Sequence, residues 1–211
     1  MAPTASRRPG RPPAAKADET RKRIVNAARE VFSERGYDGA TFQGIAERAD
    51  LTRPAINHYF SSKRVLYREV VDQTNEIVVA AGIQRAGNET TMIGRLSAFI
   101  AVSMQAENET PSTAAFLVTS VVESRRHPEL TRPGSDPVRI SREFLTWSVN
   151  DAIERGEISA DTDVASLTET LLVVLCGVGL YAGYIRSYRE MDPITGTLQQ
   201  LLGGQLGRSG S

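Results

Sequence analysis

Residues 41–66, TFQGIAERADLTRPAINHYFSSKRVL, carry two short helical patterns on either side of a turn. The hydroxyl of Thr41 can cap the first helix by accepting a hydrogen bond from an amide in its first turn. The apolar residues that follow at helical spacing are Phe42, Ile45, Ala46 and Ala49. The pattern predicts a helix of about two turns.

A second helix follows directly. Asp50 tolerates the left-handed backbone that such a turn requires. Thr52 is the expected N-cap, and Pro54 lies in the first turn, where a missing amide proton has no helical partner to lose. The stretch therefore predicts a helix-turn-helix.

The second helix has an apolar side and a polar side. Its apolar side consists of Ala55, Ile56, Tyr59 and Phe60. Arg53, Asn57 and His58 project elsewhere, and in the major groove of DNA arginine pairs with guanine and asparagine with adenine. We interpret this side as the face of a recognition helix. The alternative is the solvated surface of an ordinary helical hairpin.

This stretch resembles the DNA-binding signature of the TetR family of bacterial transcriptional regulators. The matching residues are Thr41, Ile45, Ala46, Ala49, His58, Tyr59, Phe60, Lys63 and Leu66. Two positions depart from the pattern, because Asp50 stands where the family usually has Gly and Asn57 stands where it usually has Tyr. Since Asn57 is an expected DNA-facing residue, the resemblance does not supply the preferred bases.

The resemblance implies an all-α fold of about nine helices. An N-terminal three-helix helix-turn-helix head would bind DNA, and a C-terminal helical bundle would bind a ligand and dimerise through its last two long helices. The implied function is a sequence-specific regulator, a repressor released by a small effector, on a near-palindromic operator in double-stranded DNA. The residues expected to contact DNA are Thr41, Gln43, Thr52, Arg53, Pro54, Asn57, His58, Tyr59 and Lys63.

Composition sets further bounds. The chain has 211 residues, 40% of them hydrophobic and 24% charged, which is enough for one large or two small domains with real cores. Cys176 is its one cysteine, so an internal disulfide framework is excluded. With only His58 and His127 besides, we expect no zinc-finger-type metal site and no cofactor. The N-terminus lacks the apolar segment of a secretory signal, so we expect a cytoplasmic protein.

Charge is distributed unevenly along the chain. Residues 1–68 contain 14 Lys and Arg against 7 Asp and Glu, which leaves 11 and 18 for residues 69–211. The half that contains the helix-turn-helix is therefore basic, and the other half is acidic. This asymmetry predicts one module that faces a polyanion and one that does not.

Residues 1–17 are rich in Pro, Ala and Arg and contain no acid, so we expect a disordered basic tail. Arg7, Arg8 and Arg11 lie in the sequence RRPGRP, which resembles the core of a minor-groove AT-hook. They are therefore candidate DNA contacts. The alternative is a leader that is merely basic.

Periodicity divides the rest of the chain. Residues 18–66 form the expected DNA-binding domain, residues 67–204 the effector-binding and dimerisation domain, and residues 205–211 a frayed end. The helices expected besides the helix-turn-helix span residues 18–35, 63–81, 92–106, 111–126, 138–155, 163–188 and 194–202. We expect residues 82–88 to be weakly structured and residues 128–137, with three prolines, to be a loop outside the core.

The helix expected at residues 163–188 is the most apolar. Residues 170–185 carry no charge, but 16 residues fall short of a bilayer, so we expect no membrane span and burial on most sides. The spacing of Gly179 and Gly183 permits close approach of another helix. Two apolar helices at the C-terminus also agree with a homodimer.

Few charges lie on the central helices of the second domain, which favours an apolar or amphipathic effector. The candidate effector-binding residues are Met104, Phe116, Phe144, Trp147, Cys176 and Tyr181, although each is also explained as ordinary core. Two alternatives remain: a DNA-binding regulator with no effector, constitutive or controlled by a partner, and a small helical enzyme. The two histidines form no catalytic constellation with a nucleophile, so we predict no enzyme.

Overall fold

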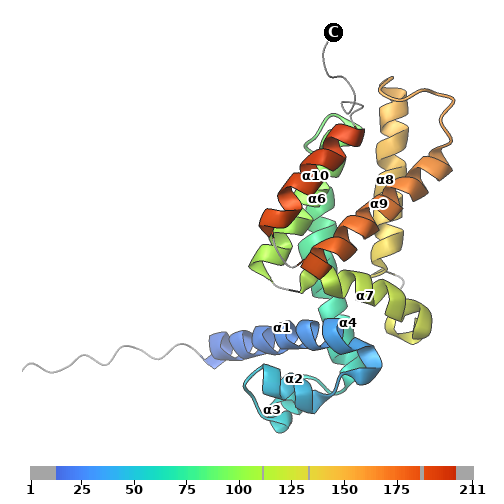
Figure 1. Ribbon diagram of the computed structural model, residues 1–211. Coiled ribbons are helices and arrows are strands. Elements are labelled where there is room, and N and C mark those ends of the chain that lie inside the picture. The colour runs from blue at the N-terminus through green and yellow to red at the C-terminus, as the bar shows by residue number, and fades with distance from the viewer. Residues whose placement is uncertain (1–12, 111, 133, 186–187, 203–211) are drawn as a thin grey trace, which may run out of the picture.

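The computed structural model describes residues 13–110, 112–132, 134–185 and 188–202. This part of the chain is helical with no strand, as predicted. The head comprises α1 (Pro13–Gly39), α2 (Phe42–Arg48), α3 (Arg53–Tyr59) and the first turns of α4 (Lys63–Asn75). The body comprises α5 (Ala81–Ala86), α6 (Met92–Glu109), α7 (Thr113–Arg126), α8 (Pro137–Glu154), α9 (Val164–Ile185) and α10 (Tyr188–Leu202). Figure 1 shows the head at one end of an elongated body.

One long rod joins the two parts. Helix α4 continues through a π-helical segment, Glu76–Ala80, into α5 without a break. The rod starts in the head, where Ser62 caps it by accepting a hydrogen bond from the Val65 amide at 3.2 Å, and it ends in the body. If α4, the π-helical segment and α5 are counted as one helix, the described residues form nine helices. A short 3-10 turn at Pro128–Leu130 is additional.

The helix-turn-helix forms as the sequence predicts. The hydroxyl of Thr41 accepts a hydrogen bond from the Gly44 amide at 3.0 Å, and that of Thr52 accepts one from the Ala55 amide at 3.4 Å. Asp50 has a φ of 50°, which is the left-handed backbone expected for the turn. These local interactions fix the start of each helix and the turn between them.

Helix α1 differs from its prediction at both ends. It begins at Pro13, so residues 13–17, which we expected in a disordered tail, are helical. Arg7, Arg8 and Arg11 lie outside the described residues. At the other end Gly36, with a φ of 68°, breaks the helical backbone before Gly39. Glycine suits this position because it has no Cβ to oppose a positive φ.

The rod is longer than predicted, because residues 82–88 are not a weak stretch and the helix runs to Ala86. A Cβ at Gly82 would lie 2.7 Å from the ring of Phe99. The glycine therefore lets α6 approach closely, and this packing outweighs the low helix propensity of glycine.

The starts of two other helices and the burial of one loop residue also differ from the prediction. Residue 111, the predicted start of the next helix, lies outside the described residues, and α7 begins at Thr113. Leu130 is 3% exposed and belongs to the head core, so the loop at residues 128–137 is not entirely outside the core. Helix α10 begins at Tyr188 with Pro193 inside it, because the loss of one amide does not outweigh the rest of the helix. The predicted frayed end, residues 205–211, lies outside the described residues.

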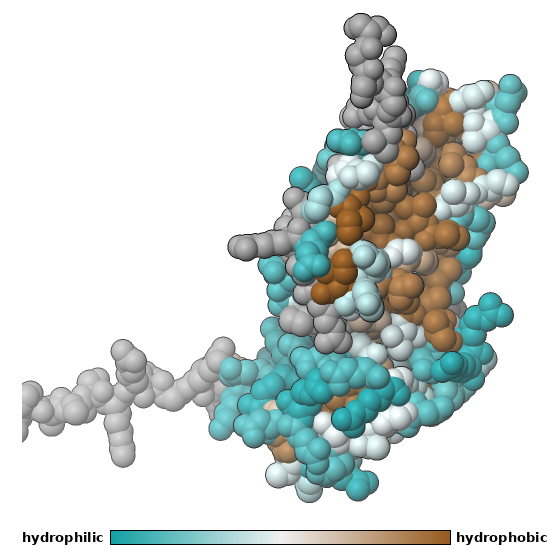
Figure 2. Space-filling view, in the orientation of Figure 1, coloured by the Kyte–Doolittle hydropathy of each residue, from teal (hydrophilic) through white to brown (hydrophobic). Residues whose placement is uncertain are grey.

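Helix α9 is not buried on most sides by its own chain, and in this respect the prediction is wrong. Val173 is 69% exposed, Leu180 59% and Tyr184 81%. Figure 2 shows a hydrophobic surface over the region of α9 and α10, whereas the head is mainly hydrophilic. The close approach expected at the glycines does occur, because a Cβ at Gly183 would lie 2.8 Å from the Cα of Ala115 in α7.

Candidate DNA-binding surface and helical cavity

The polar face of α3 is exposed. Arg53, Asn57 and His58 are exposed, whereas Ile56 and Phe60 are buried in the head core. The buried pair holds α3 in the head core against α2, so the three exposed side chains share one outward face. This face has the size and the donor chemistry that the edges of bases in the major groove require.

The other predicted contacts lie in α2 and α3, at their N-caps, or at the start of α4. Thr41, Thr52 and Pro54 are exposed, and Tyr59 is half-buried with its ring 5.3 Å from that of His58. Gln43 donates a hydrogen bond to Glu47 at 2.8 Å. The structure thus brings these residues together on the two helices of one motif.

Lys63 has a structural role that the sequence did not reveal. Its ammonium donates hydrogen bonds to the carbonyls of Tyr37 at 2.6 Å, Asp38 at 3.3 Å and Ala40 at 3.1 Å. The ammonium also lies 4.4 Å from the centre of the Tyr37 ring. Since all three donors are used within the head, Lys63 secures the chain between α1 and α2.

Several head cations are neutralised internally. Arg21 binds Glu69 at 2.6 Å, and Arg48 binds Glu30 at 2.7 Å and Glu34 at 2.8 Å. The hydrogen bond from the Arg21 guanidinium holds the pKa of the Glu69 carboxyl below its usual value. These pairs join α1 to α2 and α4, so they fix the head rather than attract a polyanion.

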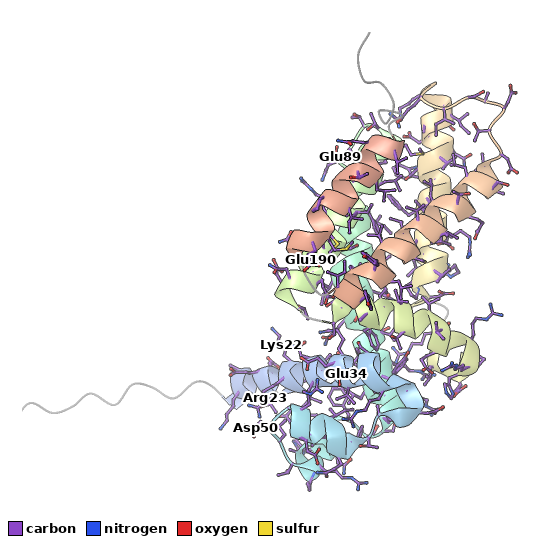
Figure 3. The ribbon with its side chains drawn as sticks, viewed as in Figure 1. Lys22, Arg23, Glu34, Asp50, Glu89 and Glu190 are labelled. Atoms are coloured by element: carbon purple, nitrogen blue, oxygen red, sulfur yellow. The ribbon has the colours of Figure 1, made fainter. Side chains whose placement is uncertain are left out.

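Arg23 positions the turn before α3. Its guanidinium donates to the backbone carbonyl of Asp50 at 3.0 Å, and Figure 3 shows both residues at the same end of the head, with Lys22 also on α1. Lys22, Arg53 and Arg64 are exposed and form no ion pair with a carboxylate in the described part of the chain. These charges remain available to a nucleic acid backbone.

Arg29 is a functional candidate that sequence reasoning missed. It is only 1% exposed, and its Nε donates to the hydroxyl of Thr74 at 3.3 Å in the rod. Burial lowers the pKa of Arg29, and the nearby Glu107 acts in the opposite direction. The residue lies beside the apolar stripe of α1, and nothing in that periodicity indicated that its charge would be enclosed between head and body.

The body contains a cavity of about 150 Å³ between the π-helical segment and helices α6 to α9. Its wall is mostly apolar and includes Val78, Ile100, Leu117, Val118, Leu172 and Cys176. Polar groups come from Ser103 and Ser141, and the hydroxyl of Ser103 donates to the Phe99 carbonyl at 3.0 Å. Such a wall suits an apolar molecule.

The structure places most of the predicted effector residues elsewhere. Cys176 lines the cavity, Tyr181 lines an open groove between α9 and α10, and Met104 and Phe144 are buried in the body core. Phe116 is packed in the head core, and Trp147 is 48% exposed with the Arg95 guanidinium 4.3 Å from its ring centre. Helical spacing indicates which side of a helix is buried or lines a cavity, but it does not indicate which other helices that side contacts.

The exposed apolar face of α9 extends onto α10. Ile194 is 39% exposed and Leu201 58%, and the groove between the two helices, of about 540 Å³, is lined mainly by apolar side chains. Helix α9 is also long and apolar enough to cross a membrane, but one such helix is weak evidence for a membrane protein. In the described residues no group of three or more His, Cys, Asp and Glu is arranged to hold a metal ion.

Known proteins share this architecture. The family described as "Bacterial regulatory proteins, tetR family" matches residues 24–70, from α1 into α4. The transcriptional regulator BetI of Agrobacterium fabrum is 32% identical over 178 residues, which cover 82% of this chain and 79% of BetI. This chain belongs to the TetR family. Escherichia coli K12 UidR, another transcriptional regulator, is 28% identical to this TetR-family chain over 162 residues, 77% of this chain and 81% of UidR.

A solved structure confirms the likeness of the fold. The fatty acid degradation regulator FadR from Bacillus halodurans has a TM-score of 0.68 at 17% identity, with 95% of this chain and all of that chain covered. The TetR-family chain is therefore a helix-turn-helix transcriptional regulator that binds DNA. Regulators of this family form dimers, respond to small molecules and are soluble proteins of the cytoplasm.

Proposed function

We propose that this regulator is a dimeric repressor whose operator binding is released by a small apolar or amphipathic molecule. The observation that carries the DNA-binding part is the outward face of α3, where Arg53, Asn57 and His58 are exposed while Ile56 anchors the helix in the head. Arg53 and Asn57 would make hydrogen bonds with bases, because their side chains carry the donors that guanine and adenine accept.

Backbone phosphates would be bound by the rim of this face. We assign that role to Thr41, Gln43, Thr52 and Tyr59, with Pro54 in van der Waals contact with DNA and His58 on the groove side. Lys63 would contribute through its charge, since its donors are occupied by carbonyls. The basic residues Arg7, Arg8 and Arg11 would add sequence-independent affinity. Residues 18–66 then act as the DNA-binding domain and residues 67–204 as the regulatory domain.

The apolar face of α9 and α10 would be the dimer interface. A single chain leaves Val173, Leu180 and Tyr184 in water, and burial of each in a two-fold interface stabilises the dimer by an amount that scales with the apolar area removed from solvent. A two-fold dimer presents two α3 helices to successive major grooves. The operator would then be near-palindromic, with half-sites about one turn of DNA apart.

The effector would occupy the apolar cavity beside Val118 and Cys176. A volume of about 150 Å³ is comparable with a cavity that accepts benzene, and it is below the usual range for drug-sized ligands. The ligand is then either small or admitted by movement of the surrounding helices. The competing function is a regulator without an effector. A fully packed body would favour it, so the presence of the cavity gives it less support.

Selection of bound fragments from a random DNA library tests the proposal. We expect an enriched near-palindrome, and we expect Arg53→Ala to weaken its binding by about 1–3 kcal/mol in gel-shift titrations. Arg85→Ala is the matched control, because Arg85 is an exposed arginine in α5, away from the head. Equal affinity of both variants, or no enriched sequence, would contradict the assignment. Screening metabolites for release of the selected DNA then identifies the effector.

A further inference from the structure

Helix α7 contacts the cavity with one side and the head with another. Leu117, Val118 and Val121 line the cavity. Residues Ser112, Phe116, Glu123 and His127 recur at helical spacing from the N-cap to the C-cap of the same helix, and they form a second stripe. The two stripes are adjacent, so one rigid element touches both the cavity and the DNA-binding domain.

The first half of the second stripe is fixed to the head core. The carbonyl of Ser112 accepts a hydrogen bond from the hydroxyl of Ser33 in α1 at 3.4 Å. Phe116 is fully buried, with its ring centre 6.4 Å from that of Phe32 and 5.6 Å from that of Tyr67. An aromatic residue of the body thus completes the core of the head.

The second half of the stripe holds the bend in α1. Glu123 is 4% exposed, and a Cβ at Gly36, where α1 bends, would lie 2.8 Å from its Oε1. Nε2 of His127 lies 3.1 Å from Oδ2 of Asp38, just beyond the bend. Helix α7 therefore contacts α1 before, at and after the bend; α2 packs against α1, and α3 packs against α2.

The rod is the other element that reaches both regions, through Val78 in the cavity wall and Leu66 in the head core. However, the π-helical segment Glu76–Ala80 interrupts its regular hydrogen bonding at the cavity. Helix α7 is α-helical from Thr113 to Arg126. A displacement at the cavity is then transmitted more directly by α7 than by the rod.

We propose that α7, through Phe116, carries the state of the cavity to the DNA-binding head. This inference rests on the proposed effector-controlled repressor and names the element that couples its two sites. An occupant that shifts α7 displaces Phe116 from the head core and turns α1, so the two α3 helices of a dimer leave their operator spacing. By linkage, operator binding and cavity occupancy oppose each other to the same extent.

Cys176 provides the test without knowledge of the effector. It is the one cysteine in the sequence, it lines the cavity, and it lies one turn before Gly179, whose added Cβ would be 3.7 Å from Val118 of α7. Alkylation with N-ethylmaleimide attaches a permanent occupant. We expect the alkylated wild-type dimer to bind the selected operator at least about fivefold more weakly than the unmodified dimer.

In Phe116→Leu the same alkylation is expected to change operator affinity by less than about twofold, because the smaller side chain uncouples α7 from the head core. Asp38→Asn gives a second, milder uncoupling at a residue whose side chain is 78% exposed, so folding is retained. It is expected to fall between wild type and Phe116→Leu. Cys176→Ala, treated identically, controls for reaction elsewhere, and light scattering checks that the alkylated protein stays dimeric.

Unchanged operator affinity of alkylated wild type would overturn the inference. An equal loss in the wild type and both uncoupling variants would also overturn it, because the signal would then bypass α7, as would dissociation of the alkylated dimer. Failure of the proposed function is a separate result, because the unmodified wild-type protein would then select no DNA.

Discussion

The head and the body bury their apolar residues in different ways. In the head Ile24, Phe32, Ile45 and Ile56 are fully enclosed within the chain, and the surface cations Arg21 and Arg48 are paired with glutamates. In the body, α9 leaves Val173 and Tyr184 in water, and the apolar surface is visible in Figure 2. The comparison shows that the head completes its core with residues of its own chain, including Phe116, whereas the body leaves an apolar surface that the proposed second chain would cover.

Val173→Glu should have the largest effect, because it disrupts the apolar surface of the body that we propose as the dimer interface. Two carboxylates per dimer would be buried without partners, each at a cost of about 3–5 kcal/mol, so the protein becomes monomeric. Light scattering measures the mass, and circular dichroism checks that the helices remain. Ala101→Glu adds the same charge at an exposed site on α6 and should stay dimeric. A dimeric Val173→Glu protein would place the interface elsewhere.

Phe32→Ala should destabilise the closed core of the head. Phe32 is fully buried against Tyr37, Tyr67 and Phe116, and loss of its ring leaves a cavity that lowers the free energy of unfolding by about 3–5 kcal/mol. Urea unfolding in the monomeric Val173→Glu background measures this without a contribution from dissociation. A loss below about 1 kcal/mol would mean that the head core is not closed in the manner described.

Asn57→Ala should change the choice of bases by the surface of the head without changing its core. The exposed amide contributes nothing to the core, so stability should be unchanged while discrimination at one base pair of each half-site falls by about 1–3 kcal/mol. Competition titrations with operators altered at single positions measure this. A uniform loss at every position would instead indicate that Asn57 acts on the backbone of DNA.

Asp50→Ala should have the smallest effect. Alanine adopts a φ of 50° less readily than aspartate does, so the free energy of unfolding should fall by about 1 kcal/mol. Asp50→Gly should remain within about 0.5 kcal/mol of wild type, since glycine accepts this backbone. The bond from Arg23 goes to the backbone carbonyl and persists in both variants. Equal stability of the two variants would mean that the turn is not strained.

The head was predictable because its determinants are local. Thr41, Asp50 and Thr52 act within four residues of their own positions, and these caps and this turn form as the sequence indicates. The body depends on contacts between distant segments. Gly82 stays helical because Phe99 packs on it, and Phe116 belongs to the head core although it lies in a body helix. Periodicity identifies an apolar face but cannot identify what covers it, which is why the exposure of α9 was not foreseen.

The contact between Gly183 and Ala115 also determines how the body can deform. A Cβ at Gly183 would lie 2.8 Å from the backbone of Ala115, whereas one at Gly179 would lie 3.7 Å from Val118, one turn nearer the cavity. The closest approach of the two helices, at Gly183 and Ala115, is the point about which they would rotate. The C-terminal end of α7 lies roughly 16 Å along the helix from this pivot, so a rotation of about 5° moves that end by about 1.4 Å. The longest lever arm of α7 thus ends beside the bend in α1.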